Sequence, residues 1–191
     1  RTLQTDYLDL YQLHALSTLA DVETAFAADG AMEVLVNARE QGKVRFLGFS
    51  AHSEQAALAA LEKFDFDTVL FPVNFVCWLE GDFGPRLVEK AKSRGMGILA
   101  LKSMALRRLN PGEKSAYDKC WYRPNEDDAL AELGLRFTLS QGTTAAIPPG
   151  ESVFFHKAVR IAGQYKPLSE AELEKLRAAA KGLTPLFSNK T

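Results

Sequence analysis

Apolar positions in this chain alternate between short continuous runs and longer stretches with helical spacing. The runs predict five strands, at residues 3–14, 44–49, 67–73, 98–101 and 143–147. Between them, apolar residues recur every three or four positions, which is typical of helices that bury one face. Gly42, Gly95 and Gly142 each follow a predicted helix and precede a strand. This order predicts parallel strands joined by crossover helices.

The helical periodicity also gives approximate boundaries and caps. Predicted helices cover residues 31–41, 54–64, 86–94, 126–140, 152–162 and 170–181. Asn125 is expected to cap the fourth of these, and Ser169 with Glu172 forms a capping box for the last. Residues 15–29 are expected to be a loop or a short helix. Residues 105–124 lack periodicity, and we expect this long loop to cover a functional site.

Length and charge exclude several classes of protein. With 191 residues and 47% hydrophobic content, the chain is expected to form one domain over residues 1–191. Its 23 basic and 24 acidic residues nearly cancel, so neither a nucleic acid nor an anionic membrane is an expected partner. No apolar run approaches the length of about 20 residues that spans a bilayer, and the first residues of this sequence lack the basic-then-apolar layout of a signal peptide.

Cysteine usage indicates a reducing compartment. Cys77 and Cys120 are far apart and form no C-x-x-C motif, so we expect no metal site, iron–sulfur cluster or disulfide framework. A cytoplasmic location and a small-molecule partner follow as expectations.

His14 is the first candidate for chemistry. It ends the first apolar run, and in a barrel of parallel strands the carboxyl end of a strand is where side chains reach a ligand. Histidine also changes charge near neutral pH. A packed or solvated histidine is the alternative.

Alternation of strands and helices leaves two architectures open, a doubly wound sheet and a (β/α) barrel. Residues 95–100 match G-x-G-x-x-A, the fingerprint of dinucleotide-binding sheets. In that fingerprint the glycines follow a strand and begin a helix. Here they end a helix and begin a strand, so we interpret them as a turn.

Residues 3–14, with the sequence LQTDYLDLYQLH, closely resemble the segment around the active-site histidine of the aldo-keto reductases. Similarity continues at residues 40–50, 72–74, 97–104 and 145–150, which resemble the fifth to eighth strands of that family's barrel. The resemblance implies an α/β fold of the (β/α)8 TIM-barrel type. It also implies that the barrel is incomplete, with strands 4 to 8 and their helices present and the first three strand–helix units absent.

The resemblance also implies a set of site residues. His14 is the implied catalytic residue, and Ser50 and Asn74 are implied to hold the nicotinamide carboxamide. Ala51 stands where most members have a second amide. The implied cofactor contacts at the later strand ends are Leu101, Lys102, Ser103, Pro148, Gly150 and Ser152. The implied cofactor is NADP, with NAD as the alternative.

The implied activity is the NAD(P)H-dependent reduction of an aldehyde or ketone to an alcohol. In that family a tyrosine donates the proton, tuned by a lysine and an aspartate, and these residues come from the first three strand–loop regions. None of the five tyrosines here lies in a matching segment. The chain also begins at Arg1 without methionine, so we interpret it as a fragment that is inactive alone and self-associates through open sheet edges.

Two other functions remain open at this point. The chain is alternatively a non-catalytic partial barrel that binds a nucleotide or forms oligomers. A third interpretation is an unrelated barrel enzyme that uses His14 with Glu or Asp partners.

Overall fold

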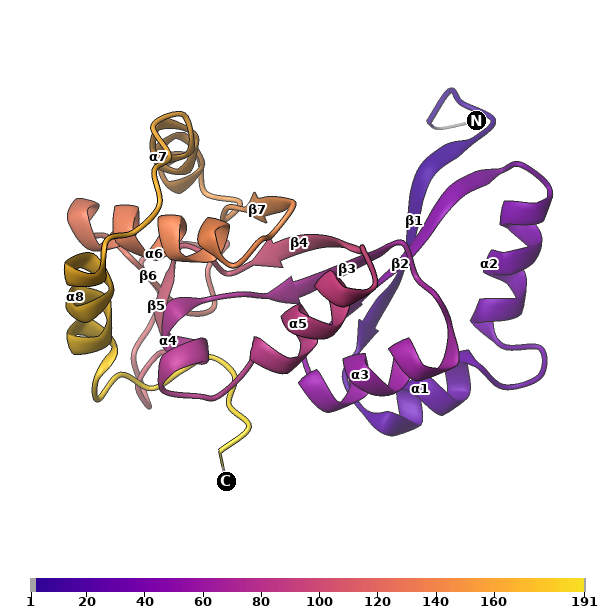
Figure 1. Ribbon diagram of the computed structural model, residues 1–191, viewed down its shortest axis with the longest axis horizontal. Helices are drawn as coiled ribbons and strands as arrows, with labels where there is room; N and C mark the ends of the chain where they lie inside the picture. The colour runs from indigo at the N-terminus through magenta and orange to yellow at the C-terminus, as the bar shows by residue number, and fades with distance from the viewer. Residues whose placement is uncertain (1–2, 191) are drawn as a thin grey trace.

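A parallel sheet of five strands forms the centre of the fold (Figure 1). The computed structural model describes residues 3–190. The expectation that the chain is a fragment rests in part on Arg1, which lies outside the described residues. The strand order is β1-β2-β3-β4-β7, and every pair is parallel. The strands are β1 (Leu8–Leu16), β2 (Val44–Ala51), β3 (Thr68–Pro72), β4 (Gly97–Leu101) and β7 (Ala145–Ile147). The carboxyl ends of all five strands therefore lie along the same side of the sheet, which we call its carboxyl edge.

Helices connect the strands, as the sequence predicts. In the described residues they are α1 (Leu19–Ala25), α2 (Ala31–Glu40), α3 (Glu54–Lys63), α4 (Phe75–Leu79), α5 (Pro85–Ser93), α6 (Asp128–Ser140), α7 (Ser152–Ala162) and α8 (Glu170–Ala180). The fold is α/β with a parallel sheet, consistent with part of a (β/α) barrel. Gly95 follows α5 and Gly97 begins β4, so the two glycines lie where a helix turns into a strand, as expected.

The two faces of the sheet differ in burial. On one face, Phe49, Val69 and Ile98 lie in neighbouring strands and are at most 1% exposed, because α2, α3 and α5 pack against β2 and β4 there (Figure 1). On the other face Leu70 and Leu99 are only partly buried, and Phe46 is 45% exposed. The helices therefore stabilise one face by excluding water from it.

Several predicted boundaries are wrong, among them the start of the first strand, which is Leu8 and not residue 3. β1 does not end at His14 but continues to Leu16, with an irregular register after Leu13. Asn125 does not cap α6; the Asp127 side chain accepts a hydrogen bond from the Leu130 amide at 2.7 Å instead. Both side chains are good caps, so only the path of the preceding chain decides between them.

The segment at 105–124 contains more regular structure than expected. β5 (Ala105–Arg107) and β6 (Arg123–Pro124) pair as a short antiparallel sheet. Arg107 donates two hydrogen bonds to Glu113, at 2.7 and 2.9 Å, and these bonds lower the pKa of that carboxyl to about 2. These bonds hold the loop at Glu113 against β5, the strand from which the loop begins.

A buried carboxylate on α3 joins three parts of the chain. Glu54 is 1% exposed, and its Oε1 accepts hydrogen bonds from the amides of Gly84 and Leu87, both at 3.1 Å. Its Oε2 accepts bonds from Arg86, at 2.6 Å, and from Asn189. Glu54 therefore satisfies the amides at the start of α5 and holds the C-terminal segment.

We expect Glu54→Ala to lower the free energy of unfolding by about 3 kcal/mol, because it leaves two buried amides without an acceptor. Urea unfolding followed by circular dichroism measures the change. Glu62→Ala on the same helix is the control, since Glu62 pairs with Lys90 in solvent. Equal shifts in the two unfolding midpoints would contradict the role given to Glu54.

Candidate functional site

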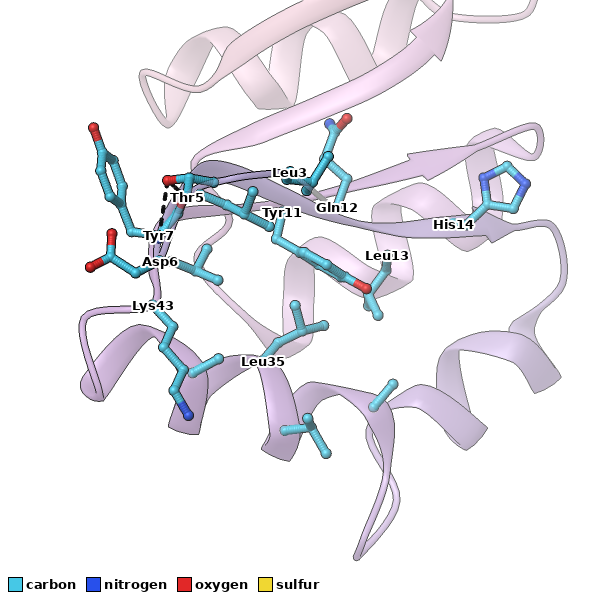
Figure 2. Close-up of a pocket in the computed structure, with 15 residues that line it drawn as sticks. Leu3, Thr5, Asp6, Tyr7, Tyr11, Gln12, Leu13, His14, Leu35 and Lys43 are labelled. Atoms are coloured by element: carbon cyan, nitrogen blue, oxygen red, sulfur yellow. Dashed lines mark hydrogen bonds between the residues drawn. The ribbon is translucent and has the colours of Figure 1, made fainter. Parts of the chain in front are cut away.

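Polar side chains gather at the carboxyl edge of the sheet. His14 lies near the end of β1, Ser50 near the end of β2, and Asn74 follows β3. Lys102 and Ser103 follow β4 directly. Figure 2 shows His14 toward the opposite end of β1 from Tyr7. The parallel topology thus brings together predicted site residues that are far apart in sequence.

Ser50 fixes the backbone beside His14. Its hydroxyl is in a residue only 4% exposed, and it accepts a hydrogen bond from the Ala15 amide at 2.7 Å. Ala15 has a φ of 54°, a conformation that non-glycine residues rarely adopt. The bond holds this strained residue in place, while the His14 ring stays exposed. Ser50 is therefore a positioning residue for His14, and its contact with a cofactor stays a prediction.

The Asn74 side chain makes all four of its hydrogen bonds within the chain. Its Oδ1 accepts hydrogen bonds from the amides of Val76 and Cys77, at 3.0 and 3.1 Å, and so caps α4. Its Nδ2 donates to the carbonyls of Lys102 and Ala105, at 3.0 and 2.7 Å. Asn74 thereby fixes the turn after β4. A contact with a nicotinamide carboxamide would have to replace one of these four bonds.

Lys102 and His52 are two partly buried basic groups at this edge, and the pKa of each is lowered from its ordinary value. Burial lowers the pKa of the Lys102 ammonium. Burial also lowers the pKa of His52, and the positive charges of Lys102 and His14 lower it further. The sequence shows no metal-ligand spacing around His52, so no motif singles it out. Its position just after β2 was the available signal.

Two sealed polar atoms lack partners near the end of β4. Ser103 Oγ and Asn125 Oδ1 are buried without a hydrogen bond, in residues that are 1% and 2% exposed. Ser103 lines a cavity of about 320 Å³, together with apolar side chains of α6 and α7 and with Pro148 at the end of β7. Leu101, the remaining residue predicted on β4, is partly buried in the sheet.

The turn before α7 carries the other predicted cofactor contacts. Gly150 is exposed, and Ser152 is the first residue of α7. Between them, the Glu151 carboxylate accepts a hydrogen bond from the Lys119 amide at 2.8 Å, and Lys119 Nζ donates to the Gly150 carbonyl at 3.1 Å. The long loop therefore packs on this turn, and the residue that precedes α7 carries a negative charge.

A larger cavity, of about 830 Å³, lies between β1 and α2. Tyr11, Leu13 and Leu35 line it, and His14 lies at one end, while Gln12 points to the opposite side of the strand (Figure 2). The cavity is mainly apolar and lies apart from Ser103. Within residues 3–190, no three Cys, His, Asp or Glu side chains gather as metal ligands, and no helix has the length and hydropathy to cross a membrane.

We expect NMR titration to give His52 a pKa below its usual 6.5. Unfolded His52 then binds protons more readily than folded His52. This group therefore makes the protein less stable as pH falls from 6.5 through the folded-state pKa. Lys102→Met should raise the pKa of His52, whereas Lys175→Met on α8 should not. An unchanged His52 pKa in Lys102→Met would show that the two groups do not interact.

Comparison with known proteins agrees with this architecture. The model of the aldo/keto reductase family matches residues 1–181. A holo-form aldo-keto reductase from Bacillus halodurans aligns with a TM-score of 0.61 at 19% identity, over 95% of this chain and 62% of its own. One from Bombyx mori, solved with NADP, aligns with a TM-score of 0.60 at 17% identity, over 93% of this chain and 59% of its own.

This chain thus spans about three-fifths of the length of these solved structures. No curated protein matched the sequence. The solved structures support the fold, and the family model covers nearly the whole sequence. The chain belongs to the aldo/keto reductase family.

Proposed function

We propose that this chain is the histidine-bearing and cofactor-binding part of an oxidoreductase that reduces aldehydes or ketones with NADPH, or alternatively with NADH. The observation that carries the proposal is the unpartnered Ser103 hydroxyl. It is sealed from solvent at the carboxyl edge of the sheet, in the wall of a cavity. The NADP in the Bombyx mori structure supports the choice of cofactor.

The residues around Ser103 fit a nicotinamide cofactor. Buried polar atoms almost always have a hydrogen-bond partner, so Ser103 Oγ and Asn125 Oδ1 need groups supplied by a ligand or water. Leu135 and Phe155 give the same cavity apolar walls. A cofactor with ring faces and hydrogen-bonding groups matches this mixture. Glu151 disfavours a phosphate at the start of α7, so the contacts predicted for Gly150 and Ser152 carry less of the binding.

The bound cofactor supplies the hydride, and the side chains of this chain orient the carbonyl. His14 is exposed at the site edge, where its ring can donate a hydrogen bond to a carbonyl oxygen. Ser50 holds the backbone that carries it. The resemblance places the proton-donating tyrosine on strands with no match in this sequence, so we expect this chain to bind cofactor without turnover.

The partly exposed face of the sheet supports the incomplete-barrel proposal. Phe46 is 45% exposed, and Leu70 and Leu99 on the same face of the sheet are only partly buried. In a closed barrel such residues are packed by side chains from the opposite strands. We therefore propose that further strands cover this face in the active enzyme, and that β1 and β7 are the edges they pair with.

We expect Ser103→Ala to weaken NADPH binding about tenfold, because one hydrogen bond to the ligand is lost. Fluorescence titration of the folded chain measures the dissociation constant. Stability should not fall, since the variant removes an unpaired buried hydroxyl.

Ser93→Ala is the matched control, because Ser93 donates only to the Lys90 carbonyl at the surface of α5. It should bind NADPH as the unchanged chain does. The proposed function would be contradicted if the chain is folded and monodisperse but binds neither NADPH nor NADH.

A further inference from the structure

Lys102 is held in an unusual backbone conformation at the site edge. Its φ of 66° is left-handed, which lysine rarely adopts. Two hydrogen bonds to its carbonyl fix this turn, one from Asn74 Nδ2 at 3.0 Å and one from the Ala105 amide at 2.9 Å. The backbone that carries the side chain is thus held by contacts with other parts of the fold.

Two aromatic rings lie next to the Lys102 ammonium. Nζ lies 5.1 Å from the ring centroid of Trp121 and 4.8 Å from that of Tyr122, both contributed by the long loop. Tyr122 is buried, whereas Trp121 is 53% exposed. Phe187 packs on Trp121 and on His52, with centroids 6.0 and 5.3 Å apart. The cluster therefore combines a held cation with an accessible aromatic surface.

No carboxylate balances this charge among residues 3–190. Lys102 Nζ makes no hydrogen bond or ion pair there, and no acidic side chain shifts its titration. The ionisable neighbours are His52, which also becomes positive, and the thiol of Cys120. The negative charge of Glu151 helps to raise the pKa of the Cys120 thiol, but the Glu151 carboxylate accepts its hydrogen bond from the Lys119 amide. A half-buried ammonium without a counter-ion is costly, and an anionic ligand would offset that cost.

We propose that Lys102 binds the carboxylate of the substrate, so that the carbonyl compounds this site takes are oxo-acids. The proposal rests on the proposed function, whose site it extends. Charge-assisted hydrogen bonds from the ammonium hold the carboxylate. Trp121 and Phe187 pack against the carbon chain between the carboxylate and the carbonyl group. A phosphate of the cofactor has the same charge chemistry and is the competing source of the anion.

The test compares a matched pair of ligands, 4-oxopentanoate and its methyl ester, which share a carbon skeleton but differ in charge. The chain has two tryptophans, so the indole N–H signal of Trp121 reports binding in an NMR titration. We expect the acid to bind at least tenfold more tightly than the ester. Lys102→Met should abolish that difference, and Lys102→Arg should retain most of it. Lys175→Met, an exposed lysine on α8, is the control and should retain all of it.

Equal binding of acid and ester to the folded chain would overturn the proposal. Inorganic pyrophosphate distinguishes the two sources of the anion. If it binds in a Lys102-dependent manner while acid and ester bind alike, the charge serves the cofactor and the oxo-acid assignment is wrong. Because no cofactor is present, the result is independent of NADPH binding. Discrimination without NADPH binding would refute only the proposed function, and NADPH binding without discrimination would refute only this inference.

Discussion

Parallel pairing of the five strands is the constraint on which the rest of the structure depends. Each strand pairs with its neighbour in the same direction, so five separate carboxyl ends reach one edge of the sheet. The helices that return the chain must then cover one face, and they bury Phe49, Val69 and Ile98 there. Residues as distant in sequence as His14 and Ser103 reach the same edge of the sheet through this arrangement. The position of these polar side chains at one edge is therefore a consequence of backbone pairing.

Hydrogen bonds between strand ends make the edge rigid. Ser50 joins β2 to the irregular end of β1, and Asn74 joins the end of β3 to the turn after β4. Each bond holds a residue with positive φ, Ala15 in one case and Lys102 in the other. Strained backbone persists only where its surroundings fix it. In this way two buried polar side chains determine where the histidine and the lysine of the site stand.

Much of the fold could be predicted because its signals are local. Glycine stops and apolar runs located all five strands of the sheet, and the capping box at Ser169 and Glu172 is confirmed. The short helix α4 was missed, because Phe75–Leu79 is too short to show a period. Strands β5 and β6 were missed because their pairing joins residues about 18 positions apart in an irregular loop. Asn125 and Asp127 are both good caps, and local sequence cannot rank them.

The resemblance predicted His14, Ser50, Asn74, Lys102 and Ser103 as site residues, and the structure places them at one edge of the sheet. Their roles stay predictions. That Asn74 is saturated by internal hydrogen bonds, or that Lys102 lies over Trp121 and Tyr122, depends on contacts across the fold. His52 becomes relevant only through the positive charges beside it. Such long-range proximity leaves no mark in a single sequence.

The most direct test of the account is to map NADPH binding on the backbone by amide chemical shifts in the isotope-labelled chain. The account predicts that shifts concentrate at the carboxyl edge, at Ala15, His52 and Ser103, and that amides at the opposite ends of the strands stay unchanged. Shifts confined to the cavity between β1 and α2, or spread evenly over the chain, would contradict it.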